Sequence, residues 1–163
     1  MKKILIMRHA KTETQEIFGS DFVRNLTSNG IIQAQIQAKF ISILPFRPDL
    51  ILLSPSNRTQ QTLAEMIPIV DWPDTHVAAK DKLYHASVSQ LLKIISEVDN
   101  SLDNLMIIGH NFGLLELVQH FSKDYIAKYK TGSLALFHFN DTSWQTLSAE
   151  SAELIYLKAP MDE

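Results

Sequence analysis

Residues 3–12, KILIMRHAKT, change abruptly from apolar to cationic. The run KILIM has the apolar, partly β-branched character of a buried strand, and Arg8 and His9 follow it without a spacer. Neither side chain belongs in a protein core without a partner. We therefore expect the strand to end at Met7, with Arg8 and His9 on the floor of a site at its end.

Two later stretches repeat this pattern. DLILLS (49–54) precedes PSNRTQQT, and NLMIIG (104–109) precedes HNFG. Short continuous apolar runs, each followed by a helical pattern, indicate parallel strands covered on both faces. The sequence thus predicts an α/β fold, a single-domain three-layer α/β/α sandwich with a mostly parallel central sheet. Loops at the carboxyl ends of neighbouring parallel strands share one crevice, so this fold gathers five side chains: Arg8, His9, Arg58, His110 and Asn111.

Hydrophobic periodicity predicts the remaining elements. Helices are expected over residues 26–44, 58–67, 87–99 and 113–122, and further strands over 76–79, 133–139 and 144–157. Pro68 is expected to stop the second helix. Ser87 and Gln90 have the spacing of a capping box at the start of the third helix.

Composition limits the possible classes of function. The 163 residues are most simply one domain, residues 1–163, of which 45% are hydrophobic and 20% charged. A net charge of −3 argues against a general nucleic-acid binder. The absence of cysteine excludes disulfides, thiol nucleophiles and thiolate metal sites. No apolar stretch approaches about 20 residues, and the N-terminal run is too short for a signal peptide, so we expect a cytoplasmic protein without a membrane partner.

Two arginines and two histidines in one crevice favour phosphoryl chemistry. The arginine fork matches the oxygens of a phosphoryl group and keeps its charge, and histidine can attack phosphorus or donate a proton. No Asp/Glu cage for a metal accompanies them, and the P-loop and HExxH motifs are absent. We expect metal-free phosphoryl transfer without a cofactor, in which side-chain charge stabilises the transition state.

Each of these residues has a plainer interpretation when it is taken alone. An Arg-His pair at a strand end is commonly structural or exposed, and Arg58 at a helix start is commonly solvated. A single histidine such as His110 can be a hydrogen-bonded core residue. A site is favoured because all three features occur at equivalent strand ends.

Five segments, in order along the chain, resemble one family. LIMRHAKT (5–12) resembles the RHG signature of the histidine phosphatase superfamily, here in the form RHA. The SixA-like phosphohistidine phosphatase branch has segments similar to DFVRNLTSNGIIQA (21–34), DLILLSPSNRTQQT (49–62), KLYHAS (82–87) and MIIGHNFGLLEL (106–117). Asn25 and Phe112 stand where that branch usually has proline, and Thr59 replaces a small residue. None of these departures removes a phosphate-binding group.

The resemblance implies a phosphoglycerate-mutase-like fold and a role for the matched residues. His9 would be the nucleophile that forms a phosphohistidine intermediate, and its other ring nitrogen would donate to a backbone carbonyl. Arg8 and Arg58 would clamp the phosphoryl oxygens, and a cationic His110 would donate a third hydrogen bond. Further candidates for substrate binding are Thr12, Asp21, Arg24 and Asn111. Arg24 is expected either to contact phosphate or to pair with Asp21.

The leaving group determines the substrate class. An alkoxide leaving group needs a general acid. Between Arg58 and His110 only Asp81 lies near a matched segment, and Asp21 is the other acid that we consider. A short chain without an evident acid or a lid suits an open site for phosphohistidine on a protein partner, whose P–N bond breaks more readily than an ester. Two alternatives stay open: a phosphatase of small phosphorylated molecules with the same fold, and a non-catalytic phosphate-binding module.

Overall fold

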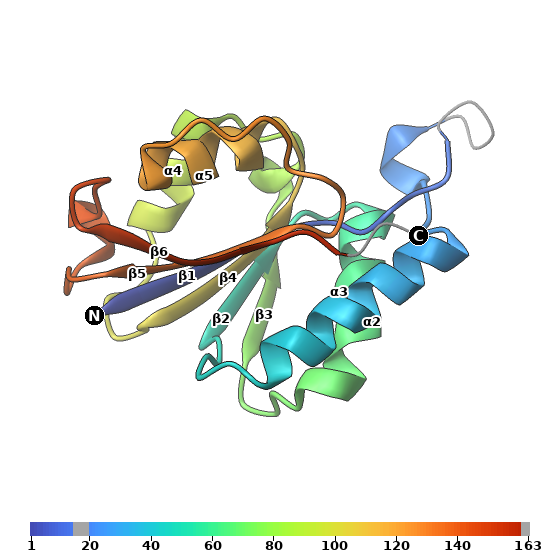
Figure 1. Cartoon of the computed structure of the whole chain (residues 1–163), viewed down its shortest axis with the longest axis horizontal. Coiled ribbons are helices and arrows are strands. Elements are labelled where there is room, and N and C mark those ends of the chain that lie inside the picture. The colour runs from blue at the N-terminus through green and yellow to red at the C-terminus, as the bar shows by residue number, and fades with distance from the viewer. Residues whose placement is uncertain (15–19, 161–163) are drawn as a thin grey trace.

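A computed structural model of the chain describes residues 1–14 and 20–160 (Figure 1). Six strands form one sheet in the order β3-β2-β4-β1-β5-β6. They are β1 (Lys2–Arg8), β2 (Leu50–Leu53), β3 (His76–Ala79), β4 (Asn104–Gly109), β5 (Leu134–Phe139) and β6 (Ala152–Lys158). The first four strands of this order are parallel, and β5 and β6 are antiparallel to their neighbours. The sheet is mostly parallel, as the sequence predicts.

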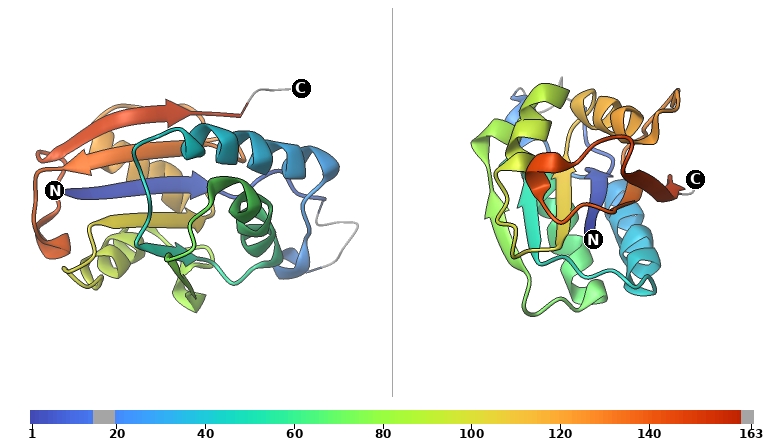
Figure 2. Two further views of the ribbon diagram at one scale, coloured as in Figure 1. Left: turned by 90° about the horizontal axis from the view of Figure 1, so that it is seen from below. Right: turned by 90° about the vertical axis from the view of Figure 1, so that its left-hand side faces the viewer.

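Four α-helices cover the two faces of the sheet (Figures 1 and 2). On one face lie α2 (Ser28–Ser42) and α3 (Asn57–Val70), and on the other lie α4 (Val88–Ser96) and α5 (Gly113–Ser122). Three short 3-10 helices complete the fold: η1 (Asp21–Val23), η2 (Asp81–Leu83) and η3 (Trp144–Thr146). The predicted three-layer sandwich is therefore confirmed. No helix among the described residues is long and apolar enough to cross a bilayer.

The central strands are buried on both faces, which explains their continuous apolar sequences. In β1, Ile4 and Ile6 belong to the core beneath α4 and α5, whereas Leu5 and Met7 belong to the core beneath α2 and α3. All four side chains are 0% exposed. The alternation follows from the two-residue repeat of a strand, and it leaves β1 rigidly fixed directly before Arg8.

Side chains determine where two helices begin. Thr27 Oγ1 accepts from the N–H of Gly30 at the start of α2. Ser87 and Gln90 form the predicted capping box of α4. Gly30 has a second role, because a Cβ there would lie 2.0 Å from the carbonyl oxygen of Lys11. Only glycine lets α2 approach the loop after β1 this closely.

The position predicted for Arg8 is wrong. Arg8 is the last residue of β1, where its N–H donates to the carbonyl oxygen of Ser133 and its register partner is Gly109. Parallel pairing with β4 and the hydrogen bond to Ser133, just before β5, extend β1 by one residue beyond the apolar run, so a charged residue completes the strand.

Two further details of the prediction are wrong. Pro68 lies inside α3, which continues to Val70, because a proline in the last turn removes only one intrahelical hydrogen bond. Trp144–Thr146 form η3 instead of a strand. The backbone N–H of Trp144 donates to Asn100 Oδ1 and its indole N–H to Leu102 O, and these bonds turn the chain before β6 begins.

Candidate active site

The loops that follow β1, β2 and β4 meet at one end of the sheet. These three strands are parallel neighbours, so their carboxyl ends lie side by side (Figure 2). Arg58, in the first turn of α3, joins two histidines. Its Nε donates to His9 Nε2 at 3.3 Å, and its Nη2 lies 3.1 Å from His110 Nδ1. The two imidazole rings are 5.3 Å apart, so the structure brings together three side chains that the sequence places at equivalent strand ends.

Hydrogen bonds define the protonation state of His9. Its Nδ1 lies 2.8 Å from the carbonyl oxygen of Ala10 and donates there, which leaves on Nε2 the lone pair that accepts from Arg58. Burial, followed by the charges of Arg58 and Arg8, lowers the pKa of His9 to about 3. A neutral imidazole with a free Nε2 lone pair is the form that attacks phosphorus.

His110 is neutral in this structure, and the expectation of a cation is wrong. Its Nδ1 accepts from Arg58, so Nε2 carries the proton and donates to Ser54 Oγ at 2.7 Å. Burial, followed by the charge of Arg58, lowers the pKa of His110 to about 2. The sequence reveals neither the burial of this ring nor the arginine against its second nitrogen.

Arg8 reaches the same end of the sheet from the last position of β1. Its Nη1 donates to the carbonyl oxygen of Tyr129 at 3.1 Å. Among the described residues, its buried Nε has no hydrogen-bond partner, which makes it a donor available to an anion. Burial and the charge of Arg58 lower the pKa of Arg8. Asn111 Nδ2 donates to the same Tyr129 carbonyl at 2.8 Å, so Asn111 is held beside Arg8.

Asp21 is the anion of this cluster. Its Oδ2 accepts from Arg58 Nη2 at 2.9 Å, and its Oδ1 accepts from Arg24 Nη2 at 2.7 Å. Burial raises the pKa of Asp21, but hydrogen bonds from Tyr84, Arg24 and His85 outweigh it and hold that pKa well below its usual range. An ionised Asp21 has no proton to give, so the structure argues against the general-acid role considered for it.

All three guanidinium nitrogens of Arg24 are engaged within the protein. Nε and Nη2 bind Asp21 Oδ1, and Nη1 donates to Thr12 Oγ1 at 2.9 Å and to the carbonyl oxygen of Glu13 at 3.0 Å. Of the two roles expected for Arg24, the structure contains the ion pair. Thr12 is thereby tied to Arg24, and a substrate contact by Thr12 stays a prediction.

Sequence reasoning misses two residues of the cluster, Tyr84 and His85. The Tyr84 hydroxyl donates to Asp21 Oδ2 at 2.5 Å, and His85 Nε2 lies 3.0 Å from the same oxygen. The His85 ring is 5.0 Å from the His110 ring. The segment KLYHAS carries a family resemblance, but it follows β3 at the sheet edge. Its approach to His110 depends on the turn after η2, which sequence spacing does not reveal.

Side chains cover the two histidines. His9 and His110 are each 4% exposed, and Arg58 is 1% exposed. The Tyr84 ring lies edge-on to His110 at 5.5 Å and 5.9 Å from the Arg58 guanidinium. The expectation of an open site is therefore wrong for the position of His9, which is buried beneath neighbouring side chains. A phosphoryl group reaches Nε2 only when the hydrogen bond from Arg58 to this nitrogen is exchanged.

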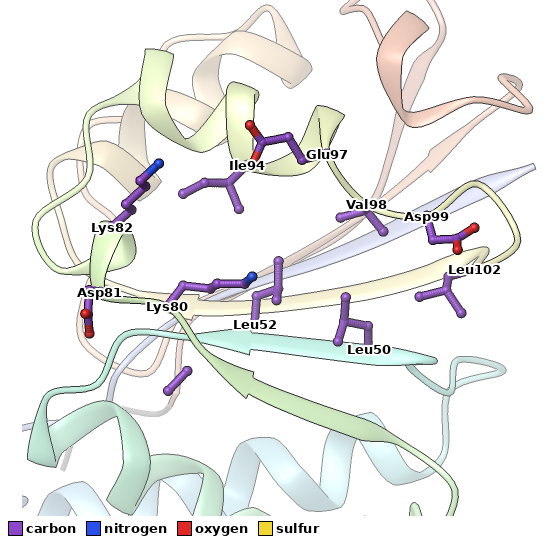
Figure 3. Close-up of a pocket in the computed structure, with 11 residues that line it drawn as sticks. Leu50, Leu52, Lys80, Asp81, Lys82, Ile94, Glu97, Val98, Asp99 and Leu102 are labelled. Atoms are coloured by element: carbon purple, nitrogen blue, oxygen red, sulfur yellow. The ribbon is translucent and has the colours of Figure 1, made fainter.

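Asp81 lies on a different cavity. This cavity, of about 550 Å³, runs between α4 and strands β2 and β3, and Asp81 lines it together with Lys80, Lys82 and Glu97 (Figure 3). Among the described residues, no side-chain hydrogen bond joins Asp81 to the cluster around His9. The general-acid role considered for Asp81 is therefore without support in the structure.

The cations beside His9 are side chains. Burial lowers the pKa of His9 most, and the positive charges of Arg58, Arg8 and Arg24 lower this pKa further. Within residues 1–14 and 20–160, no three His, Asp or Glu side chains are grouped so that they could hold a metal ion.

Residues 4–83 match the family described as the histidine phosphatase superfamily, branch 1. This range includes His9, Asp21, Arg24 and Arg58. A structure named for the proposed phosphohistidine phosphatase SixA of Agrobacterium tumefaciens superposes with a TM-score of 0.83 and 23% identity, and covers 98% of both chains. Residues 4–83, just under half of the chain, therefore match the histidine phosphatase superfamily in sequence, and the whole chain shares the fold of the SixA structure. The resemblance on which the sequence analysis rests is thereby confirmed, and the protein is a phosphatase.

Other proteins similar to this chain carry different names. The protein histidine phosphatase SixA, in a complex with tungstate, has a TM-score of 0.79 and 21% identity, with 97% of both chains covered. A structure named for a proposed α-ribazole-5′-phosphate phosphatase of Escherichia coli has a TM-score of 0.69 and 17% identity over 98% of both chains. An uncharacterised chloroplastic protein of Arabidopsis thaliana is 29% identical in an alignment of 158 residues that covers 92% of this chain and 72% of that one.

Proposed function

We propose that this histidine phosphatase hydrolyses phosphohistidine on a protein partner, without a metal ion, through a covalent phosphohistidine on His9. The state of His9 carries the proposal. Its Nδ1 is fixed by the carbonyl oxygen of Ala10, and its Nε2 presents a lone pair toward Arg58. A histidine held in this tautomer beside fixed positive charge is prepared to attack phosphorus.

The neighbouring groups have defined places in this reaction. The phosphoryl oxygens replace His9 as the partner of Arg58, which frees Nε2 for in-line attack. Among the described residues the buried Nε of Arg8 has no hydrogen-bond partner, so Arg8 can donate it to a phosphoryl oxygen. Water afterwards attacks the phosphohistidine and releases phosphate.

Exposed apolar side chains beside the cluster support a macromolecular substrate. Phe22, Val23 and Phe112 are 36%, 45% and 75% exposed. Phe22 packs edge-on against Tyr84 at 5.2 Å, and Phe112 follows Asn111 directly in the chain. Large apolar groups exposed beside a site are typical of surfaces that bind proteins. The names of the SixA relatives point to the same substrate class.

A phosphatase of small phosphorylated molecules is the second candidate. One structure with the same fold, which covers 98% of this chain as the SixA structure of Agrobacterium tumefaciens does, is named for an α-ribazole-5′-phosphate phosphatase. A cytoplasmic location stays a prediction, and neither candidate depends on it.

The deciding experiment compares turnover of a phosphohistidine-bearing protein with that of a panel of phosphomonoesters, each with and without EDTA. We expect higher kcat/KM on the phosphohistidine protein and no loss of activity on chelation, because the cations beside His9 are arginines. Preference for one ester would favour the small-molecule candidate. Activity that is lost with EDTA and restored by Mg²⁺ or Zn²⁺ would contradict the metal-free proposal. If no substrate were turned over, the alternative of a non-catalytic phosphate-binding module would be favoured instead.

Replacement of His9 tests the covalent step. We expect His9→Ala to abolish turnover and ³²P labelling of the protein, while its thermal unfolding stays cooperative. His76→Ala is the matched control, because His76 is an exposed histidine on β3. Label that persists in His9→Ala would show that the nucleophile is another residue.

A further inference from the structure

His85 lies beside the candidate active site without a role in the reaction described above. Its side chain is 51% exposed, and its Nε2 is 3.0 Å from Asp21 Oδ2. Its backbone φ is 53°, in the left-handed region that few residues other than glycine adopt. Such backbone outliers gather at functional sites.

Asp21 fixes the tautomer of His85. An ionised carboxylate only accepts hydrogen bonds, so His85 Nε2 carries a proton and donates it to Oδ2. Nδ1 is then the nitrogen that gains or loses a proton, and no residue in the described part of the chain bonds to it. An exposed imidazole with one nitrogen fixed by a hydrogen bond can transfer a proton at its other nitrogen.

His110 lies between His85 and His9. The His110 ring is 5.0 Å from the His85 ring and 5.3 Å from the His9 ring. Among the described residues, no ring contact joins His85 directly to His9. In an in-line attack the leaving atom lies opposite the nucleophile, beyond phosphorus. The leaving atom therefore points away from His9, and among the described residues His85 is the histidine whose ring contacts His110 but not His9.

The other titratable groups that face His85 cannot supply this proton. Asp21, on η1, is ionised. The Tyr84 hydroxyl already donates to Asp21, and burial together with that carboxylate raises the pKa of Tyr84. His110 is neutral, and its single N–H donates a hydrogen bond to Ser54 Oγ. Arg58 reaches His85 only through the shared Oδ2 of Asp21.

We propose that His85 is the proton donor to the leaving group, an inference that rests on the proposed function. The bond between His9 Nε2 and phosphorus forms while the bond from phosphorus to the leaving nitrogen or oxygen breaks, and the proton on His85 Nδ1 passes to that leaving atom. Water then attacks phosphorus and gives a proton to Nδ1. The His9–phosphorus bond breaks, its electron pair returns to Nε2, and phosphate leaves.

The leaving-group dependence of His85→Asn tests this inference. Asparagine tolerates the left-handed backbone and can still donate to Asp21, but it cannot transfer a proton. On an alkyl phosphate, whose leaving group needs a proton, kcat/KM should fall by about 10²–10⁴-fold. On p-nitrophenyl phosphate the loss should stay below about tenfold, because that leaving group departs without a proton.

Chemical rescue gives an independent measurement. His85→Gly also suits the positive φ and leaves space for a ring, so added imidazole should restore part of the alkyl-ester activity. His76→Asn is the control that should match the wild type on both esters. Equal losses on the two esters, or no rescue by imidazole, would overturn the role of His85. A wild-type protein that is labelled on His9 while His85→Asn behaves like the control would reject this inference and leave the proposed function intact.

Discussion

At the scale of the residue, Arg58 organises the cluster. Its guanidinium donates to His9 Nε2, to the backbone and side chain of Asp21, and to His110 Nδ1. These bonds define which nitrogen of each imidazole holds a proton. Arg58 therefore fixes the nucleophile before a phosphoryl group arrives.

The two arginines near Asp21 should differ in their kinetic effects. Arg58→Ala removes a preorganised donor next to the nucleophile, so kcat should fall by about 10²–10³-fold, or about 3–4 kcal/mol. Arg24→Ala removes a side chain whose nitrogens bind Asp21, Thr12 and Glu13, so KM should rise while kcat changes less than about tenfold. Steady-state kinetics of both variants measure the difference. Equal losses of kcat would mean that Arg24 also contacts the phosphoryl group.

At the scale of the element, the order of the strands determines which loops meet. β1, β2 and β4 are recognisable in the sequence because strands buried on both faces are apolar without interruption. Their common direction then predicts that Arg8, His9, Arg58 and His110 approach one another. Tyr84 and His85 arrive from η2 at the sheet edge, and no periodicity predicts the path of that turn. The neutral state of His110 also could not be predicted from the sequence, because it depends on burial and on the hydrogen-bond partners of its two ring nitrogens.

Gly30 links an element to the site. A Cβ at this position of α2 would lie 2.0 Å from the carbonyl oxygen of Lys11, in the loop that leads from His9 to Thr12. Gly30→Ala should destabilise the protein by about 1–3 kcal/mol through this collision, which exceeds the gain of about 1 kcal/mol in helix propensity. Urea unfolding measures the change, and kcat should fall with it because the loop moves.

Asn29→Ala is the control for Gly30→Ala. Asn29 is the exposed preceding residue of the same turn, so its replacement should change the unfolding free energy by less than about 0.5 kcal/mol. If Gly30→Ala were as stable and as active as Asn29→Ala, the close approach between α2 and the loop after β1 would not be needed for the site.

At the scale of the whole molecule, a slightly acidic protein encloses a cationic site. The net charge is −3, yet Arg8, Arg24 and Arg58 all act on the His9 ring. The ionised Asp21 offsets part of this charge, and the two buried histidines stay neutral. Below pH 6.5 the histidines of the unfolded chain bind protons that the two buried imidazoles do not bind, which lowers the free energy of unfolding. The stability of the whole protein should therefore report on the protonation state of the site.

The free energy of unfolding should fall as the pH is lowered from 7 to 5. Burial and the charge of Arg58 hold the pKa of His9 at about 3 and that of His110 at about 2, whereas an unfolded histidine has a pKa of about 6.5. Between these values the unfolded chain binds more protons than the folded one. The stabilisation is therefore fully present above pH 6.5 and is lost as the pH falls toward the folded pKa values. Each histidine should account for about 2 kcal/mol between pH 7 and 5.

Urea titrations of the wild type, His9→Gln and His76→Gln at pH 7 and pH 5 measure this effect. His9→Gln lacks one of the two buried imidazoles, so its free energy of unfolding should depend on pH less than that of the wild type by about 2 kcal/mol over this interval. His76→Gln removes an exposed histidine and should keep the wild-type dependence. If His9→Gln and the wild type lost the same free energy, His9 would be protonated in the folded protein at pH 5. Its Nε2 would then be a donor that cannot accept from Arg58, and the tautomer that prepares His9 for attack on phosphorus would not exist at that pH.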